Sequence, residues 1–160
     1  NVVDYLVQEL KLSKKHLLKT RLHERCNLCL TLDVPYRHNA LLIACRHGHL
    51  DLLRYFVNNL NVTVVDVANC GGLETAAKSC SFHIIHYLVH DANMTTQSLR
   101  KSQILKVCCE YGIFTDVQYL MESGGLTAQD ARNCNVLKIC RENNHDNIFE
   151  YFVIKSIILR

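Results

Sequence analysis

The chain has 160 residues, of which 49% are hydrophobic and 21% charged, and its formal net charge is +3. This composition excludes a disordered chain, and a content of one proline and six glycines excludes a long flexible linker. No apolar run is long enough to cross a bilayer, and no secretory signal pattern opens the chain. We therefore expect one domain over residues 1–160.

The nine cysteines indicate a reducing compartment. Nine is an odd number, which does not suit a framework of paired disulfides. Buried free cysteine behaves as a small hydrophobe, so we interpret these residues as thiols of an intracellular, cytoplasmic protein. Two tripeptides with the N-glycosylation pattern begin at Asn61 and Asn93, and such tripeptides arise easily by chance. Most of the cysteines stand at apolar helical positions: Cys45, Cys80, Cys108, Cys109 and Cys140.

The first 38 residues hold a short apolar helix and a basic segment. Residues 1–10 match the second half of a helical repeat, and since the chain opens there without Met we expect a portion of a longer protein. Residues 13–28 predict an inserted helix that is apolar on one side and cationic on the other. Its cationic side fits nucleic acid, an acidic protein or a membrane surface; a solvated face is the favoured interpretation. The basic residues are Lys11, Lys14, Lys15, Lys19, Arg21 and Arg25.

A single C-x-x-C pair, Cys26 and Cys29, lies between His23 and His38. Thiolate and imidazole are suitable zinc ligands. A structural zinc site usually has a second pair, and none follows at the usual spacing. We therefore favour plain packing and predict neither a metal nor a cofactor.

The rest of the chain repeats one pattern of two apolar helical segments around a turn. Tyr55, Tyr87, Tyr119 and Tyr151 are spaced by 32 residues, and the segments around them align without a gap. The predicted units are residues 39–70, 71–102, 103–134 and 135–160, the last with a C-terminal extension. The predicted helices are 39–47 and 49–58, 72–79 and 82–90, 102–111 and 115–122, and 135–143 and 147–154.

Turns and connectors also repeat. The turn positions are Gly48, Cys80, Gly112 and Asn144, and Cys80 fits least because its Cβ opposes a left-handed backbone. We therefore predict that the second unit is the least stable. The connectors contain Thr-x-x-Asp at Thr63 and Thr127, which is the spacing of a capped helix start. Each connector is thus predicted to form a short turn of helix.

The first unit, NALLIACRHGHL from Asn39 to Leu50, resembles the ankyrin repeat pattern T-P-L-H-x-A-A-x-x-G-H. The resemblance covers roughly residues 30–155, and the connector sequence is similar to divergent ankyrin arrays of large DNA viruses and some protists. The resemblance implies an all-α fold, an ankyrin-repeat helical solenoid. Its expected form is four stacked helix-turn-helix repeats, with an N-terminal partial repeat over residues 1–10 and a basic helix and lead-in over residues 11–38.

The resemblance also implies where a partner binds. In ankyrin repeats the contact positions are the two residues before the turn and the residue before the first helix of a unit. Tyr111 is the expected anchor, because tyrosine contributes a large contact area at a small entropic cost. A partner is expected on the concave face of the solenoid, which changes from basic in the first two units to acidic in the last two. The implied contact residues are His38, Arg46, His47, Lys78, Ser79, Ser102, Glu110, Tyr111, Glu142 and Asn143.

No pattern in the sequence builds an active site. A glycine-rich phosphate loop, a nucleophile elbow and a carboxylate pair are all absent, so we predict no catalytic residues. The first hypothesis is a protein–protein interaction module, as in a viral or parasite effector that captures a host protein. The alternatives are a binder of nucleic acid or another anionic surface through residues 11–25, and a structural spacer. His83, His86 and His90 share one helix face, where solvation is favoured over metal binding.

Overall fold

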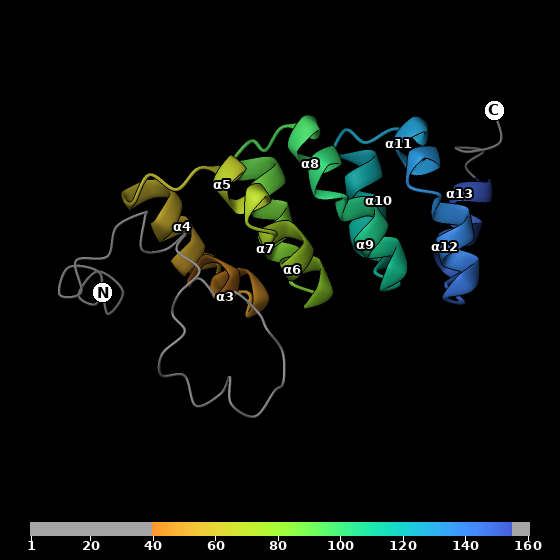
Figure 1. The fold of residues 1–160 in the computed structure, drawn as a ribbon, viewed down its shortest axis with the longest axis horizontal. Coiled ribbons are helices and arrows are strands. Elements are labelled where there is room, and N and C mark those ends of the chain that lie inside the picture. The colour runs from red at the N-terminus through yellow and green to blue at the C-terminus, as the bar shows by residue number, and fades with distance from the viewer. Residues whose placement is uncertain (1–39, 155–160) are drawn as a thin grey trace, which may run out of the picture.

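The computed structural model describes residues 40–154, and this part of the chain is a row of helices without a β-strand (Figure 1). Four inner helices lie side by side along the row, and each begins 32 residues after the one before. The period indicated by the tyrosines is therefore the period of the structure, and the predicted all-α helical solenoid is confirmed. The inner helices are α3 (Ala40–Arg46), α6 (Gly72–Lys78), α9 (Ile104–Glu110) and α12 (Val136–Glu142).

A second row of outer helices packs behind the inner row, and short connector helices line one edge (Figure 1). The prediction of helical connectors is confirmed, because each one forms a short α-helix. The connectors are α5 (Val64–Asn69), α8 (Thr96–Ser102) and α11 (Ala128–Asn133). The outer helices are α4 (Leu50–Asn59), α7 (Phe82–His86), which continues as the π-helical turn η1 (Tyr87–Asp91), α10 (Phe114–Glu122) and α13 (Asp146–Ile154).

The predicted helix boundaries agree with the structure to within one or two residues, apart from the start of the third unit and the end of α7, where the predicted α-helix to residue 90 gives way to η1. We predicted that Ser102 begins the inner helix of the third unit, and this is wrong. Ser102 instead ends α8, and Gln103 follows it with a φ of +54°. A left-handed residue cannot continue a right-handed helix, so α9 starts afresh at Ile104.

Left-handed backbone conformations recur with the same period. The turn between inner and outer helices has positive φ at Gly48 (66°), Cys80 (53°), Gly112 (70°) and Asn144 (59°). Cys80 therefore makes the same turn as the glycines, although a Cβ in this conformation costs about 1–2 kcal/mol. The other positive-φ residues are Asn61, Asn93 and Gly125 after the outer helices, and Gly71, Gln103 and Asn135 before the inner helices.

Small side chains occupy the tightest position of each inner helix. Ala44, Ala76, Cys108 and Cys140 align at one position of the repeat, and all four are fully buried. Neighbouring inner helices contact one another directly, α3 with α6, α6 with α9 and α9 with α12. Small residues at this position permit that close approach, and the cysteines act there as apolar side chains.

The tyrosines that reveal the repeat hold neighbouring outer helices together. The ring of Phe82 meets Tyr119 edge to face at a centroid distance of 5.4 Å, and Phe114 meets Tyr151 in the same way at 5.7 Å. In the first pair of units, the Arg54 guanidinium lies 5.2 Å from the centroid of the Tyr87 ring. Such aromatic pairs contribute about 0.5–1.5 kcal/mol beyond the area that they bury.

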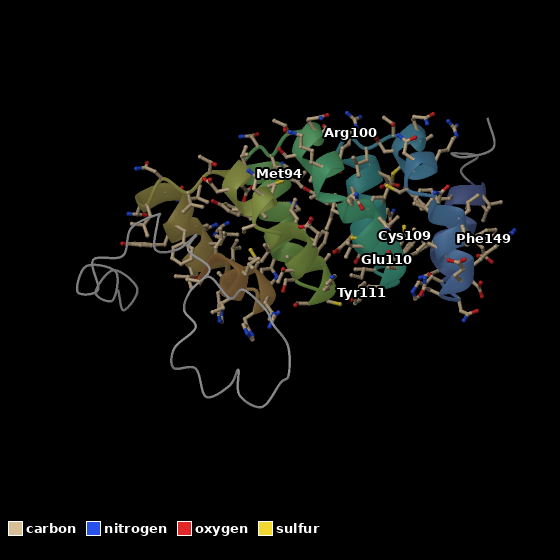
Figure 2. The ribbon with its side chains drawn as sticks, in the orientation of Figure 1. Met94, Arg100, Cys109, Glu110, Tyr111 and Phe149 are labelled. Carbon is tan, nitrogen blue, oxygen red and sulfur yellow. The ribbon has the colours of Figure 1, made fainter. Side chains whose placement is uncertain are left out.

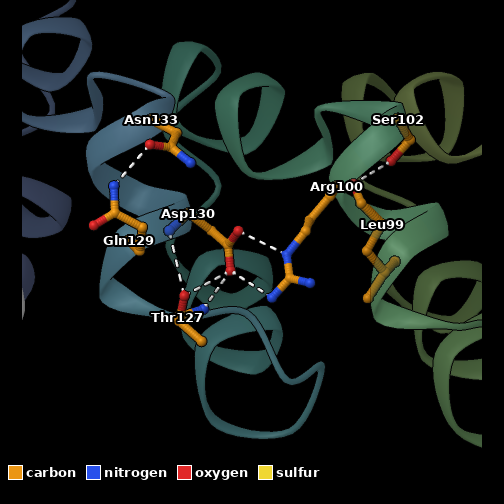
Figure 3. A network of polar contacts seen from close by, with 7 residues as sticks. All are labelled: Leu99, Arg100, Ser102, Thr127, Gln129, Asp130 and Asn133. Atoms are coloured by element: carbon orange, nitrogen blue, oxygen red, sulfur yellow. Dashed lines mark hydrogen bonds and ion pairs between the residues drawn. The ribbon is translucent and has the colours of Figure 1, made fainter.

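The connectors are held by side-chain caps. In α5 and α11 a complete capping box forms between Thr63 and Asp66 and between Thr127 and Asp130. In α8, Thr95 caps the helix, but Ser98 replaces the acidic residue. Asp130 also accepts hydrogen bonds from Arg100 of the preceding connector, at 2.7 Å from Nε and 3.2 Å from Nη2 (Figure 3).

Candidate partner-binding surface

The predicted contact residues that the structure describes lie, with one exception, where the inner helices end and turn into the outer ones. Because the inner helices run side by side and begin at equal intervals, these ends form one row. Figure 2 shows Glu110 and Tyr111 at the end of α9 that belongs to this row. We call the row the inner-tip surface, and its residues are Arg46, His47, Lys78, Ser79, Glu110, Tyr111, Glu142 and Asn143.

Tyr111 is the large apolar group of this surface. Its side chain is 53% exposed, although tyrosine usually buries its ring. The Nζ atom of Lys78, from the preceding unit, lies 5.7 Å from the centroid of the Tyr111 ring, within the range of a cation–π contact. His47, Ser79 and Asn143 hold the equivalent position in the other units, and all three are exposed.

The charges of the surface are arranged from one end to the other. Arg46 and Lys78 belong to the first two units, and Glu110 and Glu142 to the last two. The carboxylates have lysine neighbours on their own helices, Lys106 at 3.7 Å from Glu110 and Lys138 at 3.7 Å from Glu142. These exposed pairs contribute little to stability, so the glutamates remain accessible to a partner's cations.

Residues 36–65 match the family model described as ankyrin repeat. The first unit of the chain is therefore similar to the ankyrin repeat family. The match covers the first unit into α5, and the same helix-turn-helix arrangement recurs at 32-residue intervals as far as residue 154. No curated protein and no solved structure matches the chain.

Ankyrin repeats generally mediate protein–protein interactions and are typically non-enzymatic modules. A solenoid of such repeats presents an extended surface, which is what it offers to a partner. Within residues 40–154, no helix combines the length and the apolar character that a membrane crossing requires. The inner-tip surface is thus the first candidate for a binding site in this array of helical repeats.

Ser102 is the exception among the predicted contact residues. It is 6% exposed, and its hydroxyl donates a hydrogen bond to the Leu99 carbonyl at 2.8 Å. Ser102 is the last residue of connector helix α8, and its low exposure leaves almost no surface for a partner. Other predicted residues lie outside the part of the chain that the structure describes: His38, the pair Cys26 and Cys29, and the basic residues Lys11, Lys14, Lys15, Lys19, Arg21 and Arg25.

The histidines of the second unit have separate contacts. The Nε2 atom of His83 lies 2.8 Å from the carbonyl oxygen of Gly48, which ties the second unit to the turn of the first. His86 and His90 stack with their ring centroids 5.3 Å apart. In the described part of the chain, no three histidine, cysteine, aspartate or glutamate side chains converge as metal ligands.

Two carboxyl groups with buried oxygen atoms and a cavity were not predicted from the sequence. Asp116 in α10 is fully buried at the position that Ile84 and Ile148 hold in neighbouring units. That alignment of an aspartate with isoleucines was the signal that could have found it. Glu74 in α6 has a buried Oε2 atom without a hydrogen-bond partner, and it lines a cavity of about 490 Å³.

Proposed function

We propose that this ankyrin array binds a protein partner across its inner-tip surface, with Tyr111 as the central anchor. The observation that carries the proposal is the exposure of the Tyr111 ring, 53%, beside the ammonium group of Lys78. Exposed aromatic side chains on rigid helices are typical energetic centres of protein interfaces. The charge order of the surface favours a partner that is acidic opposite the first two units and basic opposite the last two.

The finer form of this hypothesis is an effector that captures a host protein in the cytoplasm. It rests on the resemblance of the connectors to viral and protist arrays and on the free thiols, of which none in the described residues forms a disulfide. The binding surface itself does not depend on the origin of the protein.

The test is affinity capture with the full chain and with a variant that combines Tyr111→Ala and Arg46→Glu. The matched control is Glu150→Ala in α13, an exposed residue outside the inner-tip surface. The amount of protein captured through the proposed surface should fall by about tenfold or more with the double variant and remain unchanged with the control. Equal capture by all three proteins would contradict the proposal and favour a structural spacer.

The basic segment from residue 11 to 25 supports a second candidate, binding to an anionic surface. It contains six lysines and arginines and one glutamate, a local charge of +5. Binding through this segment should weaken steeply with salt, because counterions are released on contact with polyanions. If neutralising Lys14, Lys15, Lys19 and Arg21 removes all affinity, the inner-tip proposal is wrong.

A further inference from the structure

A cavity of about 490 Å³ lies between two connector helices and the beginning of an inner helix. Helix α5 forms one wall, α8 forms another, and the first turn of α6 contributes Glu74. Cys70 and Ser102, which stand directly before the left-handed residues Gly71 and Gln103, both line it. The lining residues are Val65, Ala68, Asn69, Cys70, Gly71, Glu74, Ser98, Lys101 and Ser102.

The carboxyl group of Glu74 is the unusual feature of this cavity. Its Oε2 atom is buried and has no hydrogen-bond partner. That oxygen lies beside Gly71, another lining residue, at 3.9 Å from the place where a Cβ atom would stand. Glu74 forms no ion pair with any described residue, although a buried carboxylate is normally paired or hydrogen-bonded.

No other acidic side chain lines the cavity. Burial raises the pKa of the Cys70 thiol to about 11, so this thiol is neutral under ordinary conditions. Lys101 contributes a positive charge from α8, and the neighbouring Arg100 is turned toward Asp130 of the next connector. Glu74 is therefore the acidic group of this lining, and its Oε2 atom lacks a hydrogen-bond partner. Burial raises the pKa of its carboxyl, and the charge of Lys78 on the same helix opposes that rise.

The apolar part of the wall complements this charge. Val65 is 49% exposed, a high value for valine, and Ala68 stands one helical turn further along α5. Lysine and arginine side chains bury their methylene stems against apolar surface and keep a cationic group at the end. A carboxylate beside an apolar wall matches both parts of such a side chain.

We propose that this cavity receives a lysine or arginine side chain of the protein partner, with Glu74 as the counter-charge and Val65 and Ala68 against the methylene stem. The inference extends the proposed function, since it places a second contact of the same partner at the connector edge of the array. It also explains why an acidic side chain is kept partly buried in the first turn of α6 without a partner of its own.

The test uses a small probe, so it does not require the partner to be known. Full-length ¹⁵N-labelled protein is titrated with N-acetyl-arginine amide, and amide chemical shifts are followed by NMR. Saturable shifts are expected at Gly71, Glu74, Ser98 and Lys101, and N-acetyl-norleucine amide, which lacks the cation, should not produce them. Glu74→Gln, which preserves the shape of the side chain, should weaken binding of the probe by about tenfold or more.

Two further variants make the result specific. Glu150→Gln in α13 removes an exposed carboxylate far from the cavity lining and should bind the probe as the natural protein does. Lys101→Met removes the competing positive charge and should strengthen binding of the probe. The proposal is overturned if the probe gives no saturable shifts or if Glu74→Gln binds it equally well. It is also overturned if N-acetyl-glutamate amide binds instead and Lys101→Met abolishes that binding.

This outcome is independent of the inner-tip proposal. The probe reports on the cavity alone, whereas capture by the Tyr111 variant reports on the inner-tip surface alone. If the protein binds the probe but captures the same partners with and without Tyr111, the cavity proposal stands and the inner-tip proposal is wrong.

Discussion

Asp116 is a buried carboxyl in a position that otherwise belongs to isoleucine. It is 0% exposed, its Oδ2 atom has no hydrogen-bond partner, and its Oδ1 atom lies 3.4 Å from the hydroxyl of Thr115. Burial raises the pKa of this carboxyl above its usual range. A buried polar group with an unpaired oxygen costs about 1–3 kcal/mol of stability.

Replacing Asp116 by valine should therefore stabilise the protein, by about 1–3 kcal/mol near neutral pH. Because the pKa is raised in the folded state, the unfolded chain loses its proton first as the pH rises above about 3.9. The natural protein thus loses stability with rising pH until the folded carboxyl also ionises. Urea unfolding at pH 4 and pH 7 should show a larger gain for Asp116→Val at pH 7. An equal gain at both values would contradict this account.

Gly112 is required for contact between units. It has a φ of +70°, and a Cβ atom placed there would lie 2.6 Å from Cε1 of His145 in the next unit. The Nε2 atom of the same histidine ring lies 3.1 Å from the carbonyl oxygen of Glu110. Gly48 and His83 repeat this arrangement between the first two units, at 2.9 Å from the corresponding Cβ position.

Gly112→Ala should destabilise the array by about 1–3 kcal/mol, from backbone strain and from the clash with the ring. The clash should be relieved in the double variant Gly112→Ala with His145→Ala, so the two changes should not be additive. Asn144→Gly at the equivalent turn of the fourth unit is the matched control and should not destabilise. Additive losses in thermal unfolding would show that the ring contact is unimportant.

The two glycosylation-like tripeptides have a structural origin. Asn61 and Asn93 both adopt a φ of +53°, which asparagine tolerates, and Thr63 and Thr95 cap α5 and α8. The residues between them, Val62 and Met94, are 1% and 5% exposed and belong to the core. The pattern therefore follows from the repeat, and the third copy has Gly125 where the first two have asparagine.

At the scale of elements, the connectors are stabilised by short-range caps and by one pair that joins neighbouring units. Asp130 caps α11 through Thr127 and binds the Arg100 guanidinium of α8 through two oxygens (Figure 3). The hydrogen bond from the Arg100 guanidinium is the main reason that the pKa of Asp130 lies below its usual range.

Asp130→Asn should destabilise the protein at pH 7 by about 1 kcal/mol, chiefly through the weakened cap. A carboxyl with a lowered folded-state pKa contributes stability above its unfolded pKa and loses it as the pH falls through the folded value. The difference between Asp130→Asn and the natural protein should therefore close below about pH 4. Arg100→Met leaves the cap intact, so the loss of stability in this variant measures the contribution of the Arg100–Asp130 pair alone. A difference that is constant between pH 3 and pH 7 would contradict a role for the charge.

At the scale of the whole molecule, one continuous core runs through the described units, and four of the seven cysteines in residues 40–154 are buried in it. Cys45, Cys108, Cys109 and Cys140 are fully buried, whereas Cys80 is exposed at its turn. Burial raises the pKa of the Cys45 thiol to about 12, which further suppresses its reactivity.

Alkylation of the native protein, followed by peptide mass spectrometry, should label Cys80 first among the thiols of residues 40–154. The four buried thiols should react only as the array unfolds, and in urea they should become reactive together if the core is one cooperative unit. Cys80→Ser is the control for the early reaction. Labelling of Cys108 or Cys109 in native buffer at the rate of Cys80 would show that the second and third units open independently.

Much of the architecture could be predicted from the sequence, because it depends on local interactions repeated every 32 residues. The tyrosine spacing located the units, and the Thr-x-x-Asp caps located the connector helices. The resemblance to ankyrin repeats placed Tyr111 and Lys78 among the contact residues, and the structure shows them exposed and in contact.

The tertiary structure determined which side chains are buried between these helices. Ser102 is buried because it ends a connector helix, and Cys80 adopts a left-handed turn because the flanking helices require the same geometry as in the other units. The Glu74 cavity lies between the connectors of neighbouring units, and the sequence pattern of a single unit contains no information about that contact. The sequence by itself determined the period, the helices and their caps. The burial of individual polar groups, and hence the cavity, was decided only by the packing between units.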